Sequence, residues 1–434
     1  MSASPARAVA HRVLRRVTDE GAFADRAFRA EADRAGVDQR ERAFAQQLAY
    51  GTVQRLAALD YVLARLSDRP LDRIEPAVRD ALRLGVFQLL WMGSVPDRAA
   101  VEQTVELAKL SSRGAGGFAN AVMRRAAREA ATLLSEAEPA VAQSHPEWIA
   151  QLWSEALGPD EAVALMARDN EPPESAVRAN ELRTTREEVA SSLASLGVES
   201  HAAPDLPEGL VLDAPFDLHG SELFARGDVM PQSRASMLVA RVLDPRPGER
   251  VLDLCAAPGA KASHIAALMR GEGSVFAVER NEQRGRELAA NCERLGAASV
   301  EVLVRDARDV VEAGGFDRVL LDPPCSDLGT LQSRPDARWR KTPEQVEELS
   351  ALQGELLEAA ALQVRPGGTL VYSTCTISPA ENERQVERFL REHAEFRGDG
   401  RFIQLLPHRD GTDGFFMARL QRNSLGQGWP GAAG

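Results

Sequence analysis

Short apolar runs alternate with helical stretches through the second half of the chain, from about residue 236 onward. These runs are rich in β-branched residues and read RVLDLC, SVFAVE, SVEVLV, RVLLD and TLVYST. Such strands are typical of a parallel sheet that is buried on both faces by helices. The pattern predicts a doubly wound α/β domain over residues 236–434. The later stretch RFIQLLPHRDGTDGFFMARL predicts an antiparallel hairpin at the edge of this sheet.

The first part of the chain has a different rhythm, in which apolar residues recur at helical spacing. In ERAFAQQLAYGTVQRLAALDYVLARL, one face collects Phe44, Leu48, Leu56, Leu59, Leu63 and Leu66. An all-α domain of several helices is therefore predicted over residues 1–140. The glycine-rich SSRGAGG leads into a helix carrying Arg124, Arg125 and Arg128, which suits either phosphate contacts or a solvated basic face.

Residues 141–235 mix short strands with helices and predict a small α/β segment that joins the two larger domains. A strand is expected at Ser175 to Ala179 and a helix is expected to begin near Thr185. The net charge of the chain is -12. Most of this acidity falls in the middle segment, so the helical domain could still offer phosphates a local basic surface.

Several classes of protein are disfavoured by what the sequence lacks. No apolar run approaches the ~20 residues that a membrane span needs, and the basic N-terminus has no apolar core after it. A cytoplasmic protein without membrane attachment is expected. The cysteines lack the paired CxxC spacing of a zinc site, and a cytosolic chain seldom has a disulfide framework, so no metal is expected. They are Cys255, Cys292, Cys325 and Cys375.

Acidic residues stand at the expected strand ends, where ligands bind in open α/β sheets. They are Asp253, Glu279, Asp306 and Asp322. Glu279 is placed to accept both ribose hydroxyls of an adenosine, and Asp306 can reach the adenine edge. The turn CAAPGAK lacks GxGxxG, and no GxxxxGK[ST] loop is present. An adenosine site without a phosphate cradle, lined by acids that suit a sulfonium cation, points to S-adenosylmethionine. Taken singly, each acid could instead cap a helix.

Two cysteines follow neighbouring strands, Cys325 after Asp322-Pro-Pro and Cys375 after TLVYST. Enzymes that methylate amino groups often have an aromatic residue after Asp/Asn-Pro-Pro and need no nucleophile. Carbon 5 of a pyrimidine becomes nucleophilic only after something adds at carbon 6, which a thiolate can do. The residues alone do not decide which cysteine attacks. Cys292 is interpreted as a packed residue and Cys255 as part of the turn.

Three motifs of the C-terminal half resemble those of the RNA cytosine-C5 methyltransferases: DLCAAPGAK, DPPCSDLGTLQSRPDARW and YSTCTISPAENE. The N-terminal third, including GFANAVMRR, is similar to the helical NusB-type RNA-binding domain. This pairing is characteristic of the bacterial small-subunit (16S) ribosomal RNA methyltransferase B family. The resemblance implies a Rossmann-like, S-adenosylmethionine-dependent domain that makes 5-methylcytosine in 16S ribosomal RNA. The expected partner is that RNA or an early small-subunit assembly intermediate, and the expected enzyme is a monomer.

The resemblance also implies roles for individual residues. Cys375 corresponds to the nucleophile, and Cys325 to the residue that assists proton removal or release of the covalent product. Asp322 and Lys261 would also lie near the target base, which must leave its stack. The positions that correspond to cofactor-binding residues are Cys255, Ala256, Ala257, Pro258, Gly259, Ala260, Lys261, Glu279, Asp306 and Asp322.

The sequence departs from the family pattern at the turn and before it. Ala260 and Ala262 stand where the family has glycine and threonine, and Ser233 stands where an acid is common. Lys261 belongs to the turn, whereas Lys109 and Lys341, the other lysines, receive no role. Three alternatives remain: an amino-group methyltransferase, an enzyme for a cytosine of tRNA or 23S ribosomal RNA, and an RNA-binding assembly or antitermination factor.

Overall fold

The computed structural model describes residues 3–309, 314–400 and 402–424. Two compact units make up the chain, one formed by Met1–Pro172 with Leu331–Arg340 and the other by Pro173–Thr330 with Lys341–Gly434. The domain boundaries predicted at residues 140 and 235 remain predictions. Within the described residues, no helix combines the length and the apolarity needed to cross a membrane.

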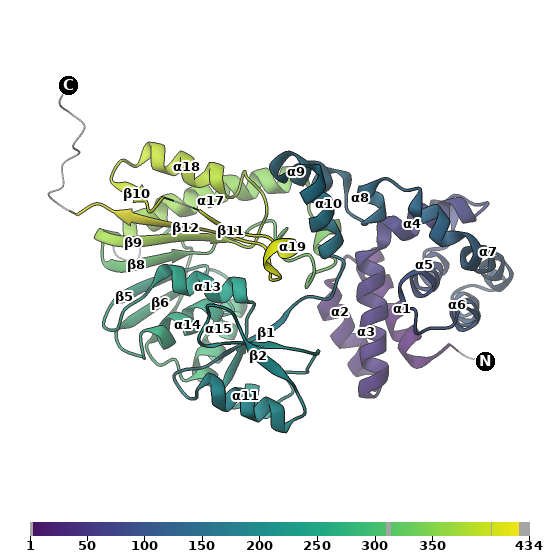
Figure 1. Cartoon of the computed structure of the whole chain (residues 1–434), viewed down its shortest axis with the longest axis horizontal. Helices are drawn as coiled ribbons and strands as arrows, with labels where there is room; N and C mark the ends of the chain where they lie inside the picture. The colour runs from purple at the N-terminus through teal and green to yellow at the C-terminus, as the bar shows by residue number, and fades with distance from the viewer. Residues whose placement is uncertain (1–2, 310–313, 401, 425–434) are drawn as a thin grey trace. The chain divides into compact units, whose positions relative to one another are not determined.

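The first unit is helical, as its apolar spacing predicts, and its helices run from purple to blue in Figure 1. The predicted apolar face is confirmed, because Leu48, Leu59, Leu63 and Leu66 are buried in one core that Phe44 and Leu56 partly cover. The helices are α1 (Pro5–Asp19), α2 (Ala24–Ala35), α3 (Gln39–Gln54), α4 (Leu56–Leu66), α5 (Pro76–Trp91), α6 (Asp97–Ser111), α7 (Ala115–Ser135), α8 (Pro139–Ala142), α9 (Glu147–Leu157) and α10 (Pro159–Arg168), with a 3-10 turn at Leu71–Arg73.

The arginines of α7 are partly committed to contacts within the helical unit. Arg125 donates to the backbone oxygen of Leu66 at 2.7 Å and lies 3.3 Å from a carboxylate oxygen of Glu129. Arg128 donates to the backbone oxygen of Arg124. Arg125 therefore holds the end of α4 in place. Fewer arginines of α7 are then available for phosphate contacts than the sequence indicates.

The segment Leu331–Arg340 packs into the helical unit, although it lies inside the motif that begins with Asp322. Its short helix α16 (Ala337–Arg340) contains Arg338, whose fully buried side chain donates to backbone oxygens of Ser144 and Asp169 at 3.2 Å. The indole N–H of Trp339 donates to the backbone oxygen of Val53 at 2.7 Å. These hydrogen bonds satisfy helix-end carbonyls that would otherwise be buried without partners.

The second unit begins with a small antiparallel sheet in the order β2-β3-β1-β4. Its elements are β1 (Ser175–Ala179), α11 (Arg186–Ser195), β2 (Ser200–Ala202), β3 (Gly209–Leu212), α12 (Glu222–Ala225) and β4 (Val229–Pro231). The predicted strand and helix are both present, and Thr185 forms a capping box at the start of α11. Buried Arg178 links this sheet to the larger one, since it donates to Gln232 and to the hydroxyl of Ser263.

The larger sheet has the strand order β10-β12-β9-β8-β5-β6-β7, with β11 paired to β12. The five adjacent strands β9, β8, β5, β6 and β7 run parallel to one another, as predicted. All of the predicted strands are present. The elements are α13 (Arg234–Leu243), β5 (Arg250–Leu254), α14 (Ala260–Leu268), β6 (Ser274–Glu279), α15 (Glu282–Leu295), β7 (Val300–Val304), β8 (Phe316–Leu321), α17 (Pro343–Gln363), β9 (Val364–Thr374), α18 (Glu383–Glu392), β10 (Phe396–Gly398), β11 (Ile403–Leu405), α19 (Pro407–Asp410) and β12 (Phe415–Arg422).

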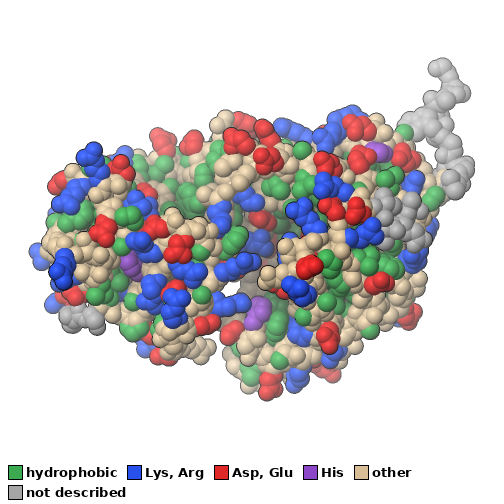
Figure 2. All heavy atoms as spheres, turned by 180° about the vertical axis from the view of Figure 1, so that it is seen from behind, with side chains coloured by type: hydrophobic (Ala, Val, Ile, Leu, Met, Phe, Trp, Pro, Cys, Tyr) green, Lys and Arg blue, Asp and Glu red, His purple; other side chains and the backbone are tan. Residues whose placement is uncertain are grey.

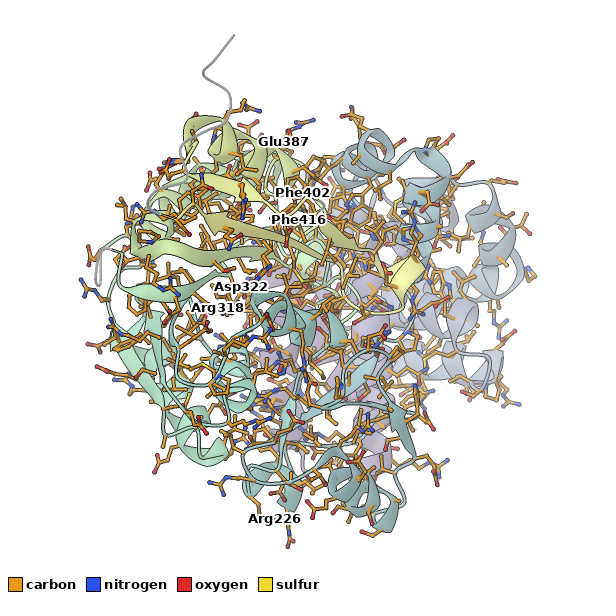
Figure 3. The ribbon with its side chains drawn as sticks, turned by 60° about the vertical axis from the view of Figure 1, so that its left-hand side comes forward. Arg226, Arg318, Asp322, Glu387, Phe402 and Phe416 are labelled. Carbon is orange, nitrogen blue, oxygen red and sulfur yellow. The ribbon has the colours of Figure 1, made fainter. Side chains whose placement is uncertain are left out.

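The predicted antiparallel hairpin at the edge of the sheet is confirmed, because β11 and β12 pair antiparallel beyond β9. β12 pairs with β9 on one side and with β10 and β11 on the other, and α19 lies in the connection. Phe416, labelled in Figure 3, is fully buried beside Phe402, which explains why this apolar strand lies inside the sheet. Arg401, the first residue of the predicted hairpin, lies outside the described residues.

Positive and negative side chains are interspersed on the face drawn in Figure 2. Because neither sign dominates that face, its charge does not by itself indicate an RNA-binding surface. Individual residues with specific contacts are therefore more informative than net charge about where a phosphate would bind.

Candidate active site

The turn between β5 and α14 is shaped by backbone that only glycine adopts easily. Gly259 has a φ of 101°, and a Cβ placed there would lie 2.7 Å from Cδ1 of Leu288. The positive φ favours glycine at this position, and a larger residue would also have to displace the Leu288 side chain. Ala260 is the first residue of α14, so its backbone is helical and alanine is not strained there. Ser233 caps α13, where its side chain accepts from the backbone N–H of Ser236.

Carboxylates lie at or just after the C-terminal ends of the neighbouring strands β6 and β7. Glu279 is 4% exposed, and one of its oxygens accepts from the backbone N–H of Asn281 at 2.9 Å. Arg284 lies 3.7 Å from the other oxygen, beyond hydrogen-bond distance. Asp306 accepts from the backbone and side chain of Arg308, and these hydrogen bonds lower the pKa of Asp306 to about 2. Both carboxylates thus lie at or just beyond the ends of neighbouring strands, and Glu279 accepts fewer hydrogen bonds than Asp306.

Asp322 follows β8 and forms an ion pair with Lys261 from α14. Figure 3 labels Asp322 together with Arg318, which lies on β8. The ammonium of Lys261 lies 2.6 Å from one oxygen of Asp322, and the hydroxyl of Ser373 donates to the other at 3.2 Å. Burial opposes the charge of Lys261, but the Asp322 carboxylate outweighs burial, so the pKa of Lys261 is raised. Lys261 therefore keeps its positive charge at neutral pH.

Asp253 lies within β5 and not beyond its end, which corrects its interpretation as a strand-end acid. The side chain is fully buried, and neither oxygen has a hydrogen-bond partner among the described residues. Burial raises the pKa of Asp253 to about 8, with the Asp322 charge acting in the same direction and Lys261 against it. The carboxyl is therefore predominantly protonated at neutral pH.

The thiols of Cys325 and Cys375 come together at one end of the sheet. Their sulfur atoms lie 3.2 Å apart, and Oδ1 of Asp327 lies 3.2 Å from the Cys375 sulfur. Cys375 is partly exposed, whereas Cys325 is 7% exposed. The hydrogen bond to Cys325 raises the pKa of Cys375 well above its usual value, and burial and nearby carboxylates act in the same direction.

Asp327 and Lys341 complete this cluster and were given no role from sequence. Asp327 has a φ of 61°, a left-handed conformation that is uncommon for residues other than glycine, asparagine and aspartate. The ammonium of Lys341 donates to the backbone oxygen of Cys325 at 3.3 Å and lies 3.9 Å from Asp327. The only signal in the sequence was the rarity of lysine, which did not distinguish Lys341 from Lys109.

Comparison with known proteins places these features in a family. Residues 240–421 match the model described as 16S rRNA methyltransferase RsmB/F, residues 4–128 match the NusB family, and residues 145–219 match an RsmF/B-like ferredoxin-like domain. A probable ribosomal RNA small subunit methyltransferase B of Synechocystis is 37% identical over 96% of this chain and 99% of its own length. The chain belongs to the RsmB/F family of methyltransferases. The family predicted from the motifs is thus confirmed.

Other relatives and solved structures agree with this RsmB/F assignment. The probable ribosomal RNA small subunit methyltransferase B of Bacillus subtilis is 35% identical and covers 89% of this chain and 92% of its own. The crystal structure of PH0851 is 28% identical, with a TM-score of 0.81 and coverage of 97% of this chain and 100% of that one. The structure of NSun6 from Pyrococcus horikoshii with SFG is 25% identical, with a TM-score of 0.59. The match covers 64% of this chain and 98% of the NSun6 chain.

The cofactor of this RsmB/F enzyme is S-adenosylmethionine, as predicted. The NSun6 structure contains SFG, an analogue of this cofactor. The residues of the chain fit this cofactor. Glu279 follows the glycine turn, and one of its carboxylate oxygens accepts no hydrogen bond from any described side chain. The fold prediction, a NusB-like helical domain and a mostly parallel methyltransferase sheet, is confirmed with it.

A buried hydrogen-bond network supports the loops that carry the thiols of the RsmB/F site. Glu381 accepts from the backbone N–H of Ser326 at 2.9 Å and from Gln353 at 3.0 Å. The hydroxyl of Tyr372 donates to the backbone oxygen of Glu381 at 2.6 Å. Glu381 lies within the quoted motif YSTCTISPAENE, but its role as the link between the two loops was not predicted. Gln353, from α17, had no sequence signal.

Glycine at position 329 is required by a close approach of two backbones. The N–H of Gly329 donates to the Cys375 oxygen at 3.0 Å, and its oxygen accepts from Gly414 at 2.7 Å. A Cβ on Gly329 would lie 2.0 Å from the backbone oxygen of Gly414. The position of the Cys375 backbone therefore depends on a residue without a side chain.

The remaining cysteines lack the character of nucleophiles. Cys292 is buried in α15, as expected, and burial raises its pKa to about 11. Burial raises the pKa of Cys255 to about 12, and its φ of 64° places it in the turn. Unlike Cys375, which has the Asp327 carboxylate within hydrogen-bond distance of its sulfur, neither thiol has such a proton acceptor among the described residues.

Proposed function

We propose that this enzyme methylates carbon 5 of a cytosine in 16S ribosomal RNA through a covalent cysteine–cytosine intermediate. The observation that carries the proposal is the 3.2 Å separation of the Cys325 and Cys375 sulfurs, close to the Lys261–Asp322 pair along the same strand ends. Methyl transfer to an amino group needs no thiol, whereas carbon 5 needs a nucleophile at carbon 6. The names of the relatives, which are small-subunit ribosomal RNA methyltransferases, support the choice of RNA.

Cys375 is the proposed nucleophile because it is the more exposed of the two thiols and has a carboxylate beside it. Its S–H proton passes to Asp327, 3.2 Å away, as the sulfur bonds to carbon 6. The electrons of the carbon 5–carbon 6 double bond then become available at carbon 5. When bound, S-adenosylmethionine supplies an electrophilic methyl group on a sulfonium. Asp322 and Lys261 hold the ring nitrogen and the amino group of the base.

Cys325 has the proposed role of completing the reaction. After methyl transfer, carbon 5 still carries a proton, which leaves to a base assisted by Cys325. The electrons of that C–H bond restore the double bond between carbons 5 and 6, and the electron pair of the carbon 6–sulfur bond leaves on the Cys375 sulfur, which recovers its proton from Asp327. The free enzyme and 5-methylcytosine result. The short distance between the two sulfurs supports this division, because both act on adjacent ring carbons.

The proposed cofactor site follows the turn and the strand ends. Residues 255–259 form the turn, and Ala260 and Lys261 begin α14. Glu279 would bind the ribose hydroxyls. Asp306 would bind the adenine, and Asp322 would contribute to both the cofactor site and the site of the target base. Carboxylates in these positions also favour a sulfonium cation electrostatically.

Bisulfite sequencing of ribosomal RNA from cells with and without the gene tests the proposal. Loss of protection at one cytosine of 16S ribosomal RNA, restored by the wild-type gene and not by the Cys375→Ala gene, is the expected result. Loss at a cytosine of 23S ribosomal RNA or tRNA would replace the proposed substrate. Unchanged protection everywhere would contradict cytosine methylation and favour a binding or assembly role.

Methylation assays with purified components test which form of the RNA is the substrate. Methylation of protein-free 16S ribosomal RNA and of assembled small subunits by the isolated enzyme is compared. We expect the free RNA or an early assembly intermediate to be methylated and the finished subunit to be refractory, because a base must leave its stack to reach the thiols. Sedimentation of the isolated enzyme is expected to give a monomer.

A further inference from the structure

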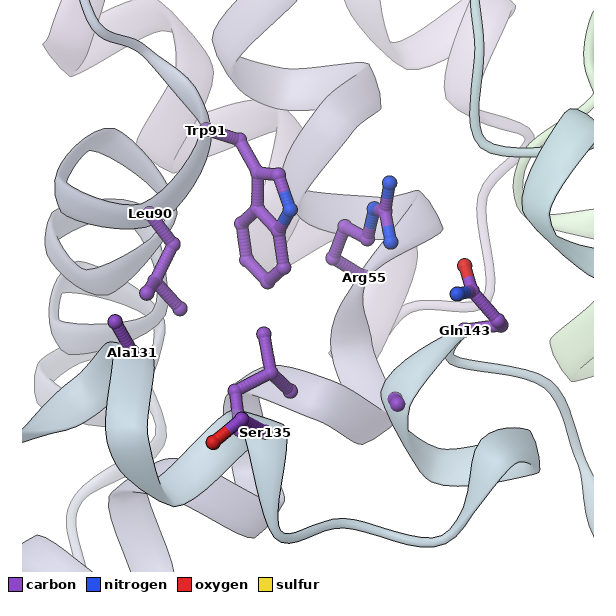
Figure 4. Close-up of a pocket in the computed structure, with 8 residues that line it drawn as sticks. Arg55, Leu90, Trp91, Ala131, Ser135 and Gln143 are labelled. Atoms are coloured by element: carbon purple, nitrogen blue, oxygen red, sulfur yellow. The ribbon is translucent and has the colours of Figure 1, made fainter.

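A cavity of about 450 Å³ lies within the helical unit and has no role in the chemistry described above. Figure 4 shows the residues that line it, which come from the ends of α3, α5 and α7 and from the end of α8. They include Arg55, Leu90, Trp91, Leu134, Ser135 and Gln143. The cavity thus combines a cation, an aromatic ring, aliphatic side chains and polar groups.

Arg55 places a positive charge in this cavity without a carboxylate to balance it. The residue is partly buried between α3 and α4, and its guanidinium lies over the ring of Trp91 at 4.8 Å. No acidic side chain in the described part of the chain forms an ion pair with Arg55. Burial alone lowers its pKa to about 10. A partly buried cation without an anion is costly unless a ligand or solvent compensates for it.

The neighbouring polar groups of the cavity are also donors. Among the described residues, the indole N–H of Trp91 has no hydrogen-bond partner, and Figure 4 shows its nitrogen on the side of the ring that faces Arg55. Buried Arg338 is a second cation near enough to interact with Arg55: burial lowers the pKa of Arg338 to about 10, the charge of Asp169 raises it, and the charge of Arg55 lowers it. A guanidinium and an N–H donor together suit an anion, above all a phosphate.

We propose that the Arg55–Trp91 cavity binds one unpaired nucleotide of the ribosomal RNA substrate, with its phosphate against Arg55 and the Trp91 N–H. This inference rests on the proposed function, because the RNA is the substrate proposed above. The aliphatic side chains of Leu90 and Leu134 give the base an apolar surface. A cavity of this volume has the size of a small-ligand site and is too small for a helix of paired RNA, so the nucleotide must be unpaired.

Arg55→Gln tests the proposal, with Arg98→Gln as the matched control. Arg98 is an exposed arginine of the same unit that pairs with Glu102. Binding of a 16S ribosomal RNA fragment is measured over a range of salt concentrations. We expect Arg55→Gln to bind about tenfold more weakly, with a log–log salt slope smaller by about 0.7, the value for one phosphate contact on a single strand. Equal behaviour of the two variants would overturn the proposal.

A second pair of variants keeps the test valid if Arg55→Gln is unstable. Arg55→Lys retains the charge and should recover most of the salt slope. Trp91→Phe keeps the ring and loses the N–H, so the fluorescence change of the wild type on titration with a single-stranded oligoribonucleotide should disappear. A fluorescence change that persists in Trp91→Phe would count against the cavity. Tighter binding of cytidine 5′-monophosphate than of the oligoribonucleotide at this tryptophan would indicate a small-molecule site and overturn the proposal.

Methylation kinetics separate this inference from the proposed function. If both hold, Arg55→Gln raises the KM for RNA about tenfold and leaves kcat unchanged, because Arg55 takes no part in the chemistry. RNA that binds with the expected salt slope and gains no methyl group on cytosine would contradict the proposed function and leave the cavity supported. Methylation by Arg55→Gln with an unaltered KM would contradict the cavity alone.

Discussion

The sulfur atoms of Cys325 and Cys375 lie 3.2 Å apart, although 50 positions separate the two residues in the chain. Each follows a strand of the parallel pair β8 and β9, whose register aligns Leu321 with Tyr372. Parallel neighbours end at the same edge of a sheet, so residues shortly after them meet there. This arrangement lets two thiols of one small cluster have different roles.

Separate alanine substitutions of the two cysteines should give different products. Cys375→Ala is expected to abolish methylation and to form no covalent complex, because no sulfur adds to carbon 6. Cys325→Ala is expected to accumulate a protein–RNA complex that survives a denaturing gel, because product release is blocked. Cys292→Ala, which changes a cysteine packed in α15, serves as the control and should keep most of the activity. A stable complex with Cys375→Ala and none with Cys325→Ala would reverse the roles.

The reactivity of Cys375 should depend on pH in a way that its neighbours control. Its pKa is raised first by the hydrogen bond to Cys325, then by burial, and further by carboxylates that include Asp327. Removing either neighbour should lower the pKa, so more thiolate is present at a given pH. Iodoacetamide alkylation of Cys375, followed by mass spectrometry, should have its midpoint at lower pH in Asp327→Asn, and lower still in Cys325→Ala. An unchanged or higher midpoint in both variants would contradict this explanation of the raised pKa.

Much of the candidate site could be predicted from sequence because strand ends are local features. Glu279, Asp306 and Asp322 follow β-branched runs, and parallel topology then brings them to one edge. Asp253 differs by a single position, since β5 continues to Leu254 and carries the carboxyl into the interior. Element boundaries are the least certain part of a pattern-based prediction, and here one residue decides whether a carboxyl lies inside a strand or at its end.

Long-range partners explain what could not be predicted. Arg338 and Trp339 bind backbone oxygens of distant helices, and backbone oxygens leave no mark on the sequence. Their segment therefore could not be assigned to the helical unit from the motif alone. The pairing of β10 with β12 is a similar case, because it joins segments that are distant in the sequence.

Arg338 should contribute strongly to the stability of the helical unit. Its fully buried guanidinium lies 2.9 Å from Oδ1 of Asn170 and also donates to the backbone oxygens of Ser144 and Asp169, which are buried as well. Arg338→Met would leave these acceptors buried and unpaired, at a cost of roughly 3 kcal/mol or more. Urea unfolding followed by tryptophan fluorescence measures the loss. Arg128→Met, at an exposed arginine of α7, should cost less than about 0.5 kcal/mol. Equal losses would show that the buried hydrogen bonds contribute little.

Asp253 should make the stability of the catalytic unit fall as pH rises. Its pKa is raised from 3.8 to about 8 on folding, mainly by burial, so between these values the folded state holds a proton that the unfolded state has lost. The free energy of unfolding therefore decreases with pH across this window. Asp253→Asn removes the titration, and its advantage in melting temperature over the wild type should be larger at about pH 9 than at about pH 5.

Asp317→Asn is the control of opposite sign, because hydrogen bonds and ion pairing outweigh burial and lower the pKa of Asp317. That variant should be less stable than the wild type at both pH values, whereas a pH-independent difference for Asp253→Asn would show that this carboxyl does not titrate in the window.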